Sequence, residues 1–133
     1  MAALDTNVLV RLLVEDDASQ SAQANALLAR CIREGQSLFV PITVALELEW
    51  VLRSAYGFTK PEVIQALSQL LSASELSFES ESALELALHL YRQTTADFAD
   101  CLHTALADRA GEPPLWTFDK SASKVQGAGQ LGP

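Results

Sequence analysis

The sequence predicts an α/β fold with a small, mainly parallel sheet. Short apolar runs that suit buried strands cover residues 2–4, 38–40, 76–78 and 115–118. Between them lie longer segments in which apolar residues recur every three or four positions, the spacing of one helix face. Strands that alternate with helices along a chain form mainly parallel sheets.

The intervening segments predict six helices. They cover residues 6–14, 18–34, 43–55, 59–72, 80–92, and a last segment from Thr94 or Thr95 to Gly111. Thr43 and Thr59 are expected to cap the third and fourth helices, and Gly35 and Gly57 suit the ends of the second and third. The chain shows no repeat and no linker, so we expect a single domain over residues 1–133, large enough for a core.

Composition limits the class of protein. Hydrophobic residues make up 49% of the chain, which argues against disorder, and no apolar run is long enough to span a bilayer. The start MAALDTN lacks the features of a signal peptide. Cys31 and Cys101 lie on apolar helix faces and are expected to be reduced core thiols of a cytoplasmic protein. The net charge of −8 argues against a broad nucleic-acid-binding surface, although a nuclease would still fit.

Four acidic residues stand out by their positions relative to these elements. Asp5 and Asp119 follow strand runs, and parallel-sheet proteins place their working residues at the carboxyl ends of strands. Glu47 and Asp100 lie on predicted helices. Carboxylates brought together repel one another unless a cation neutralises them, and their oxygens are the ligands that hard divalent cations prefer.

Each of these residues also has an ordinary structural explanation. Asp5 suits a helix N-cap, and Asp119 suits a turn. Glu47 lies at the edge of an apolar stripe, where the alternative to a metal ligand is a buried ion pair. Glu49, which points the opposite way, is expected to be solvated. Asp97, Asp100 and Thr104 share one helix face, which a solvated polar surface would also explain.

Taken together, the four acidic segments resemble the motifs of the PIN-domain nucleases, in particular the VapC-type toxins of prokaryotic toxin–antitoxin pairs. The segments are LDTNVLVRLL, ALELEWVLRSAYG, DFADCLHTALA and LWTFD, and the resemblance covers Leu4 to Lys120. It implies a three-layer α/β/α sandwich and an endoribonuclease that depends on Mg²⁺ or Mn²⁺. It also implies inhibition by a small cognate antitoxin of the VapB type, and it points to a homodimer.

Motif position assigns roles to individual residues. The resemblance implies that Asp5, Glu47, Asp100 and Asp119 are the catalytic residues and metal ligands, with Asp97 as a further ligand or a neighbour of the ligands. Thr6, Asn7 and Thr117 match polar neighbours that orient water and carboxylates, and Lys120 is the cation that we expect near a phosphate. Family members usually add a final strand, but GAGQLGP is poor strand material, so whether this strand forms stays open.

Apolar residues suggest where partners would bind. The predicted helices 43–55, 59–72 and 80–92 carry more apolar stripes than a small sheet can cover, which favours a homodimer. Trp50, Tyr56 and Phe58 cluster in sequence and are expected to form the antitoxin surface.

Two other functions stay open. A phosphohydrolase with an aspartyl nucleophile would need a second Asp two residues after Asp5, where Asn7 stands. A non-catalytic protein-binding module would use the acidic pocket only to receive an arginine of a partner. Cleavage of RNA with and without Mg²⁺ would separate these functions from a nuclease.

Overall fold

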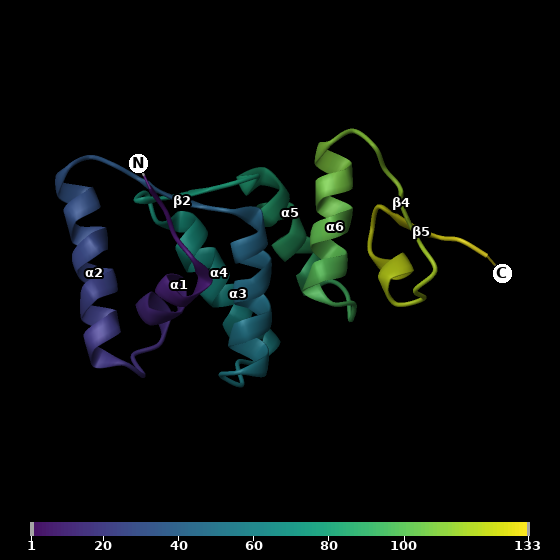
Figure 1. Cartoon of the computed structure of the whole chain (residues 1–133). Coiled ribbons are helices and arrows are strands. Elements are labelled where there is room, and N and C mark those ends of the chain that lie inside the picture. Colours follow the sequence, from purple (N-terminus) through teal and green to yellow (C-terminus); the bar gives the residue numbers. More distant parts are fainter. Residues whose placement is uncertain (1, 133) are drawn as a thin grey trace. The chain divides into compact units, whose positions relative to one another are not determined.

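The structure is a computed structural model in which residues 2–132 are described (Figure 1). The chain divides into two compact units, with the division between Glu79 and Ser80. Every pair of strands in the described residues is parallel. The predicted α/β class with a small parallel sheet is therefore confirmed.

The first unit contains a three-stranded sheet in the order β1-β2-β3. Its strands are β1 (Ala2–Ala3), β2 (Leu38–Val40) and β3 (Leu76–Phe78). In the register, Leu38 lies opposite both Ala2 and Leu76. Leu38 and Val40 are buried while Phe39 between them is 38% exposed, because successive side chains of a strand point to opposite faces.

Four helices complete the first unit. They are α1 (Thr6–Leu13), α2 (Ala18–Arg33), α3 (Ile42–Ser54) and α4 (Lys60–Ser72). Helix α1 packs against both α2 and α3, and α3 packs against α4 (Figure 1). Leu9, Leu48, Leu52 and Val63 are fully buried in this core. The packing holds the start of α1 beside α3, which positions the first part of the candidate site.

Helix α3 differs from the prediction at its start. Pro41, not Thr43, occupies the N-cap position in an extended conformation, and its carbonyl oxygen accepts from the backbone N–H groups of Val44 and Ala45. The N–H of Ile42 donates to Glu79 Oε1 at 2.8 Å. The helix therefore begins two residues earlier than a Thr43 cap would allow, and Thr43 is an exposed residue of its first turn.

The buried face of α3 also differs from the predicted one. Its buried residues are Ala45, Leu48, Glu49 and Leu52. The expectation that Glu49 is solvated is wrong, since it is 2% exposed and forms an ion pair with Arg53, four residues on. A second hydrogen bond joins Arg53 NH2 to Glu49 Oε1 at 3.2 Å. Glu47, by contrast, is exposed.

The second unit contains two helices, two strands and a short 3₁₀ turn among its described residues. They are α5 (Glu81–Arg92), α6 (Phe98–Arg109), β4 (Leu115–Thr117), η1 (Ala122–Lys124) and β5 (Ala128–Gln130). Helices α5 and α6 pack together, and the rings of Tyr91 and Phe98 meet edge to face with centroids 5.4 Å apart. The predicted inner face of α5, which includes Leu84 and Leu88, is buried.

Helix α6 begins at Phe98, so the predicted start at Thr94 or Thr95 is wrong. The hydroxyl of Thr94 accepts from the N–H of Ala96 at 3.2 Å, a local bond that competes with helix formation. Asp97 is consequently the N-cap residue in an extended conformation, outside the helix. Thr104, predicted on a polar face, is buried, and its hydroxyl donates to the carbonyl oxygen of Asp100 at 2.7 Å.

The final strand, which the sequence left open, does form. Strand β5 pairs in parallel with β4, with Trp116 opposite Gly129. A Cβ atom on Gly129 would lie 2.8 Å from Cζ3 of Trp116, closer than real contacts allow. The glycine that made this segment poor strand material therefore leaves the room that the indole ring occupies.

Two predictions from composition can be compared with the structure directly. Cys31 and Cys101 are both buried, as expected of core thiols, and neither forms a disulfide within the described residues. No helix within residues 2–132 combines the length and the apolar character needed to cross a membrane.

Exposed apolar residues lie elsewhere than the sequence suggested. Across the described residues, the large exposed ones are Ile32, Phe39, Trp50, Trp116, Phe118 and Leu131. Helices α4 and α5 expose none of these residues, so no large apolar side chain of their stripes is exposed. Of the expected antitoxin cluster only Trp50 is exposed, while Tyr56 and Phe58 are half-buried. The surplus of stripes that favoured a homodimer is therefore absent from α4 and α5.

Candidate functional site

Asp5 occupies the N-cap of α1 directly after the first strand. Its Oδ1 accepts from the N–H of Thr6 at 2.7 Å, and its carbonyl oxygen accepts from the N–H of Val8 at 3.2 Å. The ordinary capping explanation therefore holds for one carboxylate oxygen. Because the residue is exposed and the cap uses only Oδ1, the other oxygen stays available to a ligand.

Glu47 lies near Asp5, and Thr6 forms hydrogen bonds with both residues. The Oγ1 of Thr6, which is 5% exposed, donates to Oε1 of Glu47. This bond joins the start of α1 to α3. The side chains of both carboxylates and of Thr6 line one pocket of about 290 Å³, together with Asn7, Val10, Arg11, Val51 and Tyr56. The first unit therefore brings two of the four predicted carboxylates together.

One end of this pocket carries a compact polar network that the sequence did not reveal. Arg11 NH1 donates to Asp16 Oδ1 at 2.8 Å and to the Tyr56 hydroxyl at 3.2 Å, and that hydroxyl donates to Asp16 Oδ2 at 2.9 Å. The hydrogen bond with Tyr56, followed by the charge of Asp16, raises the pKa of Arg11 further above its usual range, against the effect of desolvation. Arg11 therefore stays cationic, but the carboxylate of Asp16 balances its charge.

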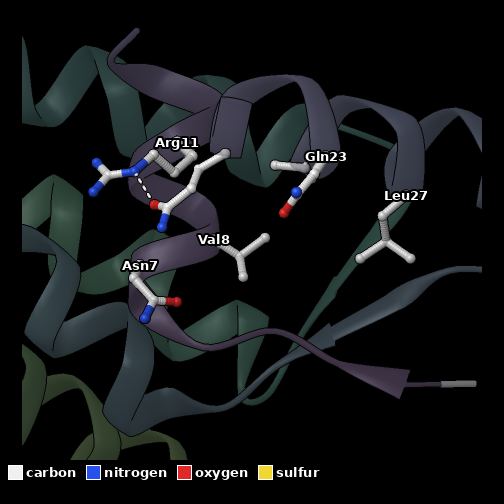
Figure 2. A pocket seen from close by; sticks show the side chains of 7 residues that line it. Asn7, Val8, Arg11, Gln23 and Leu27 are labelled. Atoms are coloured by element: carbon white, nitrogen blue, oxygen red, sulfur yellow. Dashed lines mark hydrogen bonds between the residues drawn. The ribbon is translucent and has the colours of Figure 1, made fainter. Parts of the chain in front are cut away.

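A second pocket lies between α1 and α2 and has a volume of about 300 Å³ (Figure 2). Helix α1 contributes Asn7, Val8 and Arg11, and α2 contributes Gln20, Gln23, Ala24 and Leu27. Asn7 and Arg11 line both pockets. Sequence reasoning missed this pocket, although the residues from α2 follow the i, i+3, i+4, i+7 spacing of one helix face.

In the second unit, Asp97 and Asp100 lie at the start of α6. Asp97 is exposed, and its side chain makes no capping bond. Asp100 is half-buried in the first turn. The N-terminal end of a helix favours negative charge, because its backbone N–H groups point outward there. The start of α6 is therefore a favourable position for both acidic side chains.

Asp119 follows β4 in a tight turn. Its Oδ1 accepts from the N–H groups of Ser121 at 2.8 Å and Ala122 at 3.0 Å. Its own N–H donates to Oγ1 of Thr117 at 3.0 Å. The turn explanation therefore holds for one oxygen of Asp119, and Thr117 helps to hold the backbone of this residue. Lys120, the next residue, is exposed.

The predicted ligands are thus divided between the two units. Asp5 and Glu47 belong to the first, whereas Asp97, Asp100 and Asp119 belong to the second. Among residues 2–132, no three His, Cys, Asp or Glu side chains form a metal-binding group. Mg²⁺ commonly uses only one or two protein carboxylates and completes its shell with water. The exposed oxygens of the Asp5–Glu47 pair fit that kind of donor set.

Comparison with known proteins places the chain in a family. The PIN domain family matches residues 2–128. The chain is also similar to a VapC ribonuclease of Aquifex aeolicus (strain VF5), with 24% identity over 125 residues. This alignment covers 94% of the chain and 92% of that protein.

Proposed function

This chain belongs to the PIN domain family, and on that premise we propose that it is a divalent-metal-dependent endoribonuclease, the toxin of a toxin–antitoxin pair. The observation that carries the proposal is the pairing of Asp5 and Glu47 in one pocket, with Thr6 bonded to both residues. The metal is Mg²⁺ or Mn²⁺. Similarity to a protein named VapC ribonuclease supports RNA as the substrate.

In this proposal Asp5, Glu47, Asp100 and Asp119 hold the metal, and Asp97 is a further ligand or a neighbour of the ligands. A divalent metal, when bound, supplies an activated water and neutralises charge that develops on the phosphate. Thr6 keeps the Glu47 carboxylate turned toward the start of α1.

Three further polar residues act beside the carboxylates. Thr117 orients Asp119, because its hydroxyl oxygen accepts a hydrogen bond from the backbone N–H of Asp119. Asn7 faces the acidic pocket and can bind water or RNA there. Lys120 contacts phosphate, for which its exposed position next to Asp119 is suitable.

Residues 1–133 work, in our proposal, as a single PIN domain. The family match runs without interruption through both compact units. Each unit supplies part of the predicted ligand set, so neither half alone would carry the proposed activity.

The test is cleavage of unstructured RNA by the purified chain. We expect cleavage with Mg²⁺ or Mn²⁺ and none after a chelator removes divalent ions, with activity restored when the metal is added back. A protein that cleaves equally well in the chelator would contradict metal-dependent hydrolysis. A protein that never cleaves, under any divalent ion, would favour a non-catalytic binding module.

Two protein partners belong to this proposal, which places the toxin in the cytoplasm. A small basic antitoxin of the VapB type would suit a chain of net charge −8, because the planar guanidinium of arginine pairs with carboxylates through two hydrogen bonds. The exposed Trp50 on α3 offers an apolar contact beside the acidic pocket. We also propose a homodimer.

Light scattering tests both partners in one series. The chain alone should give twice its mass of 14.4 kDa, and adding the basic product of the neighbouring gene should give a larger complex that no longer cleaves RNA. A mass of 14.4 kDa throughout the dilution series contradicts the dimer. Undiminished cleavage in excess partner contradicts the antitoxin.

A further inference from the structure

We propose that the pocket between α1 and α2 binds one unpaired nucleobase of the RNA and so selects the sequence at the cleavage position. This inference rests on the proposed ribonuclease function and adds a recognition site to it. The pocket lies wholly within the first unit, on residues that none of the four acidic motifs assigns to substrate selection.

The lining combines aliphatic side chains with amide groups. Val8 from α1 and Leu27 from α2 border the space, and the amide end of Gln23 points into it toward Val8 (Figure 2). The aliphatic groups can pack against a base. The amides of Asn7, Gln20 and Gln23 stand around the same space. Proteins that read unpaired RNA bases form hydrogen bonds to the base edges, and these amides can supply such bonds. A volume of about 300 Å³ is at the small end of ligand sites.

The amide of Gln20 has a defined orientation. Its Oε1 accepts from Nε of Arg11 at 2.6 Å, and because an arginine Nε–H can only donate, the atom that faces it must be the oxygen. The NH₂ group of Gln20 therefore remains as a donor. The side-chain amide of Gln23 makes no hydrogen bond to the described residues of the first unit and offers both a donor and an acceptor. Glutamine amides of this kind form paired hydrogen bonds with adenine.

Charge distinguishes a base from other occupants. Arg11 is the one charged residue of the described lining, and it is already paired with Asp16. A phosphate would find no unpaired cation there, and an arginine of a protein partner would find no carboxylate in the lining. An apolar side chain would leave the amides without partners, which is costly when water is displaced. A neutral ring with polar edges satisfies both parts of the lining.

The position of the pocket connects it to the proposed chemistry. Asn7 and Arg11 line this pocket and also the acidic pocket of Asp5 and Glu47. A nucleotide whose base lies between α1 and α2 would therefore be held next to residues that border the carboxylates. The base bound here would be that of a nucleotide next to the cleaved bond.

Titration of the metal-free, ¹⁵N-labelled full chain with each of the four ribonucleosides tests the site without any need for catalysis. The side-chain amide signals of Gln20 and Gln23 should shift and saturate with one or two nucleosides and stay unchanged with the others. Gln23→Leu should weaken binding of the preferred nucleoside by about 5- to 150-fold, the discrimination that one good paired contact supplies. Gln65→Leu, an exposed glutamine of α4, should bind as the wild type does.

The same variants can be compared in RNA cleavage. Gln23→Leu should broaden the base preference next to the cleaved bond, whereas Gln65→Leu should leave the preference unchanged. Titrations that are flat for all four nucleosides, or shifts of equal size with each, would overturn the subsite even if the chain cleaves RNA. Base-selective binding by a protein that cleaves no RNA would support the subsite and contradict the nuclease proposal instead. If Gln23→Leu weakens binding of the antitoxin and leaves nucleoside binding unchanged, the pocket is a protein-docking site and the inference is wrong.

Discussion

Replacing Asp5, Asp100 or Asp119 by asparagine should lower metal-dependent RNA cleavage by about a hundredfold or more while the chain stays folded. Loss of a residue that merely supports a metal ligand commonly costs about 10–100-fold in activity. Removing the charge of a ligand itself should therefore reach or exceed the upper figure. Glu47→Gln is expected to behave in the same way.

The structure explains why these variants should keep their folds. Asparagine at residue 5 can still accept from the N–H of Thr6, since asparagine and aspartate are equally good N-caps. At residue 119 its side-chain oxygen can still accept from Ser121 and Ala122. Glutamine at residue 47 can still accept from the hydroxyl of Thr6. Alanine would break each of these bonds and would mix a loss of stability with a loss of charge.

Asp17→Asn is the matched control for Asp5→Asn. Asp17 caps α2 through a bond from the N–H of Gln20 at 3.0 Å, so both aspartates are helix caps but only Asp5 lies in the acidic pocket. Cleavage rates at saturating Mg²⁺ and circular dichroism are the two measurements. Wild-type cleavage by Asp100→Asn, or equal losses in Asp5→Asn and Asp17→Asn, would contradict the ligand assignment.

Arg53→Ala should destabilise the first unit by about 2–3 kcal/mol, less than the 3–5 kcal/mol typical of a fully buried pair. The change removes an ion-pair partner of Glu49, whose side chain is 2% exposed. The Arg53 side chain is 35% exposed, so water already weakens the interaction and the cost is lower than for two buried charges. Urea unfolding followed by circular dichroism measures the difference.

The double variant Glu49→Met, Arg53→Met separates the two parts of this effect. With both charges gone and the helix propensity kept, its stability should return to within about 1 kcal/mol of the wild type or exceed it, since apolar residues often replace buried pairs without loss. A double variant as unstable as Arg53→Ala would mean that packing, not the lost charge partner, dominates. Glu49→Gln is consequently a poor control for Glu47→Gln, because residue 49 belongs to the core.

The order and type of the main elements followed from hydrophobic spacing, because α1, α2, α4 and α5 each have one clear apolar stripe. Helix α3 does not. Its sequence ITVALELEWVLRS carries apolar residues on several faces, so spacing alone could not decide which face is inside. Tertiary packing decides it. Glu49 is 2% exposed, whereas Glu47 lines the acidic pocket, and no residue of the helix reveals this arrangement by itself.

One other error and one question that the sequence left open have similar causes. The start of α6 depends on one local hydrogen bond at Thr94, which helix spacing does not register. The final strand depends on Gly129 making room for Trp116, a residue of another strand. At the candidate site, residue type and position in the chain identified Asp5 and Glu47 as neighbours. The spacing of Gln20 and Gln23 went unused, because their pocket forms only when α1 and α2 pack together.

The indole that rests against Gly129 has an optical consequence. The chain contains two tryptophans, Trp50 in the first unit and Trp116 in the second, and both are 59% exposed. Trp50→Phe leaves Trp116 as the sole strong emitter, in the half that contains Asp100 and Asp119. Trp116→Phe leaves Trp50 to report on the half that contains Asp5 and Glu47. The two halves of the chain therefore carry separate fluorophores, and coincident or separate melting of their emission distinguishes one cooperative transition from two.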